Sequence, residues 1–176
     1  MWSIRCRLAS AMYFLFIEQN QVKMSEQIIL LDLNKTLAVE IGLTLPSFTY
    51  DVSKDVYSVV LVEKIRGRRI FLITARTDNY AEETKRRIIT ETGLGIERFY
   101  FKPLSIKKTP VHFFKRDVVL SLFDEGFKSS DFFGLESNSR TRSEYAKLGI
   151  KSVPRDVFLK GDYDKTETKN QAIGTG

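Results

Sequence analysis

The chain has 176 residues and a formal net charge of +6, and its 43% hydrophobic and 28% charged residues are the balance of an ordinary globular domain. This composition excludes a disordered, collagenous or coiled-coil chain. One cysteine, Cys6, and one histidine, His112, exclude a disulfide framework and a zinc site built from several cysteines or histidines, and they disfavour Ser-His or Cys-His catalysis. Enzymatic chemistry would therefore fall to carboxylates, hydroxyls, lysines and a hard metal ion. The positive charge favours polyanionic partners.

Residues 1–24 precede the first predicted strand. Arg5 and Arg7 stand before the apolar stretch 8–17, as in a short signal peptide, but no small-x-small cleavage pattern follows. The stretch is also shorter than the ~20 apolar residues that cross a bilayer. We interpret 1–24 as an extension upstream of a start at Met24, and we expect a cytoplasmic protein without a membrane span. A true export signal and an amphipathic helix on the domain surface are the alternatives.

Five apolar runs alternate with helical patterns along the rest of the chain. The predicted strands are 28–31, 69–73, 98–101, 131–135 and 150–153. The predicted helices are one capped by Ser53 with apolar positions Val56, Val59, Val60 and Ile65, then 79–92, 111–125 and 142–148. Helix 111–125 is expected to turn Phe114, Val118, Val119, Leu122 and Phe123 inward. A glycine follows each helix.

This alternation predicts βαβ units, and hence an α/β, Rossmann-like three-layer sandwich with a central parallel sheet of about five strands. We assign residues 25–159 to one such domain. Residues 160–176 are predicted to be a disordered tail, because almost no apolar residues remain there. Ligands of such folds bind outside the carboxyl ends of the strands, so functional residues are sought directly after each strand.

Asp32, after the first strand, is a candidate nucleophile, since a carboxylate can attack phosphorus to form an aspartyl-phosphate; the alternative is a turn-capping aspartate. Thr74 ends the second strand, where its hydroxyl either holds a phosphoryl oxygen or caps a helix. Arg76 is a candidate phosphate clamp. Lys115 can neutralise charge on a transferring phosphoryl group, or it is one more solvated lysine. Glu136 can complete a Mg²⁺ site with Asp32.

In this order the residues resemble the motifs of the haloacid dehalogenase-like (HAD) superfamily of aspartyl phosphatases. Four apolar residues precede Asp32-Leu-Asn-Lys-Thr36-Leu, matching the family's Asp-x-Asp-x-Thr-Leu. An apolar strand ends in Thr74, Lys115 precedes a helical run, and a fourth strand ends in Glu136. The resemblance implies Mg²⁺ held by Asp32, Asn34 and Glu136, and catalysis by Asp32, Asn34, Thr74 and Lys115.

Within that superfamily the chain is similar to the phosphatase domain of phage-type polynucleotide kinases. The matching segments are Thr74-Ala-Arg76, Lys102-Pro-Leu104, and Glu136-Ser-Asn138 followed by Gly149-Ile150. This similarity implies a substrate phosphate held by Thr36, Arg76 and Lys102, and it implies nucleic-acid 3′-phosphate ends or nucleotides as substrates.

Two positions depart from the family pattern. Asn34 stands where the family has the acid that protonates the leaving group, and an amide cannot transfer that proton, although its backbone carbonyl can still bind metal. Glu136 and Ser137 replace two aspartates, so one charge is lost. These changes keep a second reading open, that of a weakened or inactive binding module.

The lengths between motifs leave no room for a large cap domain, which predicts an open site. Residues 98–116 beside it hold six basic residues and no acid, with five aromatic residues among them. That composition suits a nucleic-acid backbone and its bases, although some of the aromatic residues are expected to lie in the core. A phosphatase of small metabolites or phosphoproteins is the third reading. The sequence does not indicate an oligomeric state.

Overall fold

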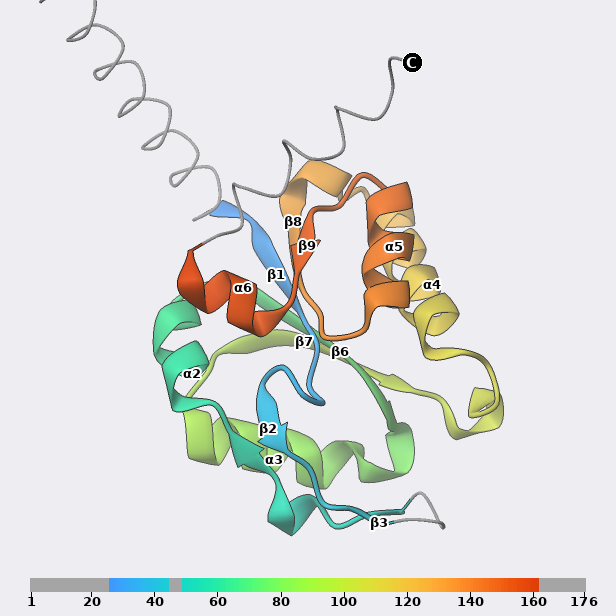
Figure 1. The fold of residues 1–176 in the computed structure, drawn as a ribbon. Coiled ribbons are helices and arrows are strands. Elements are labelled where there is room, and N and C mark those ends of the chain that lie inside the picture. Colours follow the sequence, from blue (N-terminus) through green and yellow to red (C-terminus); the bar gives the residue numbers. More distant parts are fainter. Residues whose placement is uncertain (1–25, 45–48, 162–176) are drawn as a thin grey trace, which may run out of the picture.

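The computed structural model describes residues 26–44 and 49–161, so the predictions for 1–24 and for 162–176 lie outside the described residues. Its centre is a five-stranded parallel sheet in the order β7-β6-β1-β8-β9 (Figure 1). The strands are β1 (Ile28–Leu31), β6 (Ile70–Thr77), β7 (Ile96–Lys102), β8 (Phe132–Leu135) and β9 (Ser152–Val153). The predicted parallel sheet of five strands is confirmed.

Helices cover both faces of this sheet (Figure 1). On one face lie α2 (Val59–Ile65), α3 (Ala81–Thr92) and α6 (Arg155–Lys160), and on the other lie α4 (Val111–Asp124) and α5 (Ser139–Lys147). Side chains of a strand alternate between faces, so Ile29 and Leu31 of β1 join the first core while Ile28 and Leu30 join the second. The molecule is therefore the predicted three-layer α/β sandwich. Within the described ranges, no helix has the length and apolarity to cross a membrane.

The segment between β1 and α2 forms a flap rather than a cap domain. In it, β2 (Ala38–Glu40) pairs with β5 (Val56–Tyr57), and β3 (Leu43–Thr44) pairs with β4 (Thr49–Tyr50), both antiparallel. The 3₁₀ helix η1 (Val52–Lys54) lies between β4 and β5. The described part of this segment thus contains only short strands and one helical turn, in keeping with the expected absence of a large cap.

The predicted helix with a cap at Ser53 is wrong. Tyr57 pairs with Ala38 of β2, so the backbone stays extended until Ser58, whose hydroxyl caps α2 by accepting a hydrogen bond from the Leu61 N–H at 3.3 Å. Val59 and Val60, two of the apolar positions on which that prediction rested, are 73% and 65% exposed. Pairing with a distant strand has overridden the local helical spacing.

Other elements also differ from prediction. Strand β6 continues to Thr77, so Thr74 and Arg76 lie within a strand rather than after it. Ser152–Val153 is shorter than predicted, and α6 was not predicted at all. Lys160, placed in the predicted tail, is the last residue of α6, which ends at Gly161 in the left-handed conformation.

Candidate functional site

A buried lysine joins two carboxylates at the carboxyl ends of the neighbouring strands β1 and β8. The ammonium of Lys115, on α4, lies 2.6 Å from Asp32 Oδ1 and 2.6 Å from Glu136 Oε2. The Lys115 side chain is 1% exposed, and the two acids are hardly more so. Burial acts against the charge of Lys115, but the two carboxylates outweigh it and raise its pKa. The chain thus builds a compact charged centre where ligands of this fold class bind.

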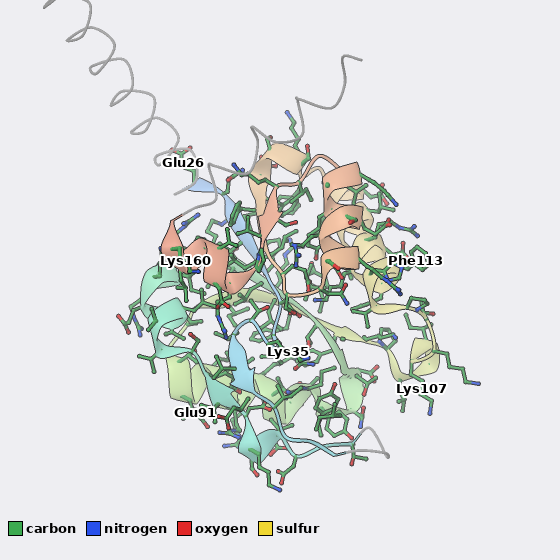
Figure 2. The ribbon with its side chains drawn as sticks, viewed as in Figure 1. Glu26, Lys35, Glu91, Lys107, Phe113 and Lys160 are labelled. Atoms are coloured by element: carbon green, nitrogen blue, oxygen red, sulfur yellow. The ribbon has the colours of Figure 1, made fainter. Side chains whose placement is uncertain are left out.

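The loop after β1 holds the other oxygen of Asp32. Oδ2 accepts hydrogen bonds from the hydroxyl of Thr36 at 2.9 Å and from that of Ser137 at 2.8 Å. Ser137 Oγ also lies 3.1 Å from the backbone carbonyl oxygen of Asn34. The loop turns back through Lys35, labelled near the centre of Figure 2, whose φ of 62° is left-handed. Both carboxylate oxygens of Asp32 are therefore fixed in direction.

Glu136 is fixed just as firmly. Its Oε1 accepts a hydrogen bond from the backbone N–H of Asn138 at 2.9 Å, and Asn138 in turn caps the amino end of α5. Arg142 Nη1 donates to the carbonyl oxygens of Glu136 and Ser137, which holds the turn between β8 and α5. Burial raises the pKa of Glu136 to about 7; Lys115 lowers it and the charge of Asp32 raises it.

This shift predicts how stability depends on pH. Between the ordinary value of 4.5 and about 7, the folded protein keeps a proton on Glu136 that the unfolded chain has lost. The free energy of unfolding should therefore fall as the pH rises through that window. Urea titrations at pH values from 4.5 to 8 measure this slope. The variant Glu136→Gln, which cannot titrate, should flatten it, and an unchanged slope would assign the effect to another group.

The oxygen atoms here are of the kind that Mg²⁺ prefers. Ser137 Oγ lies within hydrogen-bond distance of both Asp32 Oδ2 and the Asn34 carbonyl oxygen, and Lys115 links Asp32 to the carboxylate of Glu136. Within residues 26–44 and 49–161 there is no cluster of three or more His, Cys, Asp or Glu side chains suited to a metal. A metal held here would rely on carbonyl, hydroxyl and water oxygens besides the carboxylates.

Arg76 lies in a closed network rather than at an open phosphate position. Its side chain is fully buried, and its two terminal nitrogens contact the carboxylate of Asp55 at 2.7 and 3.1 Å. It also donates to the hydroxyl of Thr84 and to Oδ1 of Asn34, and it lies 4.7 Å from the ring centroid of Tyr50. The structure therefore places Arg76 where it ties the flap to β6 and orients the Asn34 amide.

The Arg76–Asp55 pair should be a main support of the flap. Removing one partner of a fully buried ion pair leaves an uncompensated charge, which costs about 3–5 kcal/mol. We expect Asp55→Asn to destabilise the protein by that amount in chemical denaturation. The control is Asp51→Asn, four residues earlier on the same flap, where the acid is 44% exposed and pairs with Lys54. Equal losses of unfolding free energy in the two variants would show that the buried pair stabilises the protein no more than an exposed one.

Two further predicted residues form hydrogen bonds within their own strand or loop. The Thr74 hydroxyl is buried within β6 and accepts a hydrogen bond from the Arg76 backbone N–H at 3.1 Å. The Lys102 ammonium donates to the carbonyl oxygens of Lys107 (2.8 Å) and Thr109, and burial lowers its pKa. The structure thus brings Asp32, Asn34, Thr36, Lys115 and Glu136 together, but it turns Lys102 toward its own loop.

Sequence reasoning missed three participants. Asp55 and Tyr50 come from the flap, and only the tertiary fold brings them to Arg76 and Asn34. Ser137 was noted only as a lost charge, yet its hydroxyl binds Asp32 directly. Its position immediately after Glu136, at a strand end, is the signal that could have identified it.

Comparison with known proteins gives a structural likeness alone. No protein-family model matches the chain, and no curated protein matches it. Among solved structures, a chain of the Pnkp1/Rnl/Hen1 RNA repair complex aligns with a TM-score of 0.54 and 16% identity, over 73% of this chain and 41% of that one. A hypothetical protein from Xanthomonas campestris aligns with a TM-score of 0.47 and 12% identity, over 87% and 92% of the two chains. The present chain therefore shares an α/β fold with a part, less than half, of the repair-complex chain.

Proposed function

We propose that this chain is a magnesium-dependent phosphohydrolase of the HAD-like type, which forms an aspartyl-phosphate on Asp32 and acts on nucleic-acid 3′-phosphate ends or nucleotides. The observation that carries the proposal is the placement of Asp32. Its carboxylate lies at the carboxyl end of the central strand β1, and Lys115, Thr36 and Ser137 contact it. A nucleophile needs this kind of fixed direction to attack in line with a leaving group.

The reaction would proceed in two displacements. A carboxylate oxygen of Asp32 forms a bond to phosphorus while the bond from phosphorus to the ester oxygen breaks, and the ester oxygen leaves as an alkoxide or phenolate that takes a proton from solvent water. Water then attacks the same phosphorus, releasing inorganic phosphate and restoring the carboxylate. Lys115, 2.6 Å from Asp32, offsets negative charge throughout. Mg²⁺, held by Asp32, the Asn34 carbonyl and Glu136, would supply further positive charge to the phosphoryl oxygens.

Proton delivery is the weak part of this site. The Asn34 amide accepts from Arg76 at 3.3 Å and donates to the Tyr50 hydroxyl at 3.4 Å, and neither arrangement lets it give up a proton to a leaving group. Substrates whose leaving group departs without a proton, such as aryl phosphates, are therefore favoured. The same observation supports a second candidate function, a module that binds phosphorylated ends without hydrolysing them.

Nucleic acid as the substrate class has two supports. One solved structure that shares the fold is a chain of an RNA repair complex. The described part of the segment between β1 and α2 holds only short strands and one helical turn, and a site without a large cap favours a macromolecular end over a small molecule. Small metabolites are disfavoured, because without a cap the substrate must be held by its own extended contacts.

A substrate panel tests the proposal. An aryl phosphate should be hydrolysed with Mg²⁺ and not after chelation with EDTA. A 3′-phosphorylated oligonucleotide should be hydrolysed with a higher kcat/KM than a 3′-mononucleotide. If neither the aryl phosphate nor the phosphorylated nucleotides are hydrolysed but the phosphorylated oligonucleotide binds tightly, the proposed phosphohydrolase activity is overturned and the binding-module function is favoured. Preference for the mononucleotide would overturn the assignment to nucleic-acid ends.

A further inference from the structure

An exposed basic and aromatic surface lies beside the charged centre, in the loop after β7 and the first turns of α4. We define the 104–116 surface by Leu104, Ile106, Lys107, Lys108, Phe113 and Arg116. Leu104, Ile106 and Phe113 are 49%, 39% and 38% exposed, so three large apolar side chains of this one segment lie open to solvent. Figure 2 places Lys107 and Phe113 on the same side of the molecule.

Hydrogen bonds hold the loop in place. The ammonium of Lys102, 4% exposed, donates to the carbonyl oxygens of Lys107 and Thr109. The backbone N–H of Leu104 donates to Asp78 Oδ1 at 3.2 Å, which ties the loop after β7 to the loop after β6. These two hydrogen bonds from Lys102 fix the backbone path of residues 104–109. Their outward side chains are therefore presented in one arrangement before any partner binds.

The two loop lysines, Lys107 and Lys108, are not engaged by the acids that the structure describes. Lys107 and Lys108 are exposed, and within the described part of the chain neither forms an ion pair. No acidic residue occurs from Arg98 to Arg116. Of the six basic residues in that segment, the structure engages Arg98 with Glu125, Lys102 with its loop, Lys115 with the two acids and Arg116 with Asp117. Lys107 and Lys108 are therefore the cations left to bind an anion.

The aromatic part of the surface is arranged for stacking. The ring of Phe113 lies 4.2 Å from that of His112, and the guanidinium of Arg116 lies 4.9 Å from the Phe113 centroid. An aromatic ring beside a planar cation is a common platform for an unpaired base. Phe113 and Arg116 flank Lys115 in sequence on α4, so this platform lies within one helical turn of a residue that contacts Asp32.

We propose that the 104–116 surface binds the nucleotides next to the end that Asp32 processes in a single-stranded nucleic acid, with Lys107 and Lys108 on backbone phosphates and Phe113 stacked on a base. The assignment rests on the proposed function for the identity of that end, but its own chemistry is binding alone. A single strand is required because the bases of a duplex are not free to stack on a side chain. An acidic peptide would use the lysines but not the stacking platform.

Fluorescence anisotropy with the full chain and a labelled single-stranded oligonucleotide without a terminal phosphate tests the surface. Replacing two phosphate contacts in Lys107→Gln/Lys108→Gln should reduce the slope of log K against log salt concentration by about 1.4. Phe113→Leu, which keeps an apolar side chain but removes the ring, should weaken binding roughly 5- to 150-fold. A duplex of the same sequence should bind less tightly.

The control is Lys128→Gln/Lys160→Gln, which removes the same charge from exposed positions remote from the site. Lys128 lies before β8, at the amino ends of the parallel strands, and Lys160 lies on the opposite side of the molecule from Lys107 and Phe113 in Figure 2. The proposal would be overturned if oligonucleotide affinity changed equally in both double variants, or if Phe113→Leu left that affinity unchanged. It would also be overturned by binding to vesicles rich in phosphatidylserine that depends on the same residues and exceeds binding to the oligonucleotide.

The outcomes separate the two proposals. Specific oligonucleotide binding without hydrolysis of any phosphate ester would support the 104–116 surface and overturn the enzyme. Hydrolysis of an aryl phosphate without oligonucleotide binding would support Asp32 as a nucleophile and overturn the surface.

Discussion

Asp32→Asn should abolish Mg²⁺-dependent hydrolysis of every phosphate ester while leaving the protein at least as stable as the parent. The carboxamide is no nucleophile toward phosphorus, and no other carboxylate lies at the end of β1. Initial rates with an aryl phosphate measure the loss. The control is Asp156→Asn, on the exposed first turn of α6, which should keep full activity. Turnover retained by Asp32→Asn would exclude an aspartyl-phosphate on this residue.

The stability expectation follows from the charges. Two buried carboxylates share the one ammonium of Lys115, and removing the charge of Asp32 leaves a balanced pair of Lys115 and Glu136. The charge of Asp32 also contributes to the raised pKa of Glu136, so that pKa should fall in the variant. Thermal melting at neutral pH should show an unchanged or higher midpoint. A marked loss of stability would mean that Asp32 serves mainly to hold the fold.

Asn34→Asp should raise turnover of an alkyl or sugar phosphate by roughly 10²–10⁴-fold, the usual worth of general acid–base catalysis. A carboxyl group at this position can protonate a poor leaving group and then accept a proton from the attacking water. The structure accommodates it, because Arg76 already donates to Oδ1 and the Tyr50 hydroxyl can donate to the new oxygen instead of accepting. An aryl phosphate, whose leaving group needs no proton, should gain far less.

Comparison of the two substrates decides the outcome for Asn34. Equal gains for the aryl and the alkyl ester would show that the added charge acts through something other than proton transfer. If both substrates remain unhydrolysed, the defect lies at Glu136 and Ser137, and the binding-module function takes precedence. Asn79→Asp, an exposed position after β6, adds the same charge without reaching the leaving group and serves as the control.

The sheet could be predicted because its strands are buried on both faces and therefore appear as continuous apolar runs, as in Ile28–Leu31 and Phe132–Leu135. The flap could not. Its strands are two or three residues long and depend on partners far along the chain, such as Ala38 for Tyr57. That pairing is what moved the start of α2 from the predicted cap at Ser53 to Ser58.

The site divides in the same way. Asp32 and Glu136 directly follow β1 and β8, which are neighbouring strands in the sheet. The rule that ligands bind at the carboxyl ends of parallel strands was therefore enough to predict that they share a site. The contacts of the Arg76 and Lys102 side chains could not be predicted from the sequence. Arg76 binds the carboxylate of Asp55 on the flap, and Lys102 donates to carbonyl oxygens of its own loop. No sequence pattern predicts either partner.

Detection of the covalent intermediate tests the central claim most directly. The full chain is mixed with excess aryl phosphate and Mg²⁺, and the reaction is quenched in acid within the first turnovers. The protein is then digested, and the masses of its peptides are measured by mass spectrometry. The account predicts one phosphoryl group on the peptide that contains Asp32, absent from the Asp32→Asn variant and more abundant in the parent than in Asn34→Asp, because a carboxyl group speeds hydrolysis of the intermediate. Steady hydrolysis with no phosphoryl group on that peptide, or with one on another residue, would contradict it.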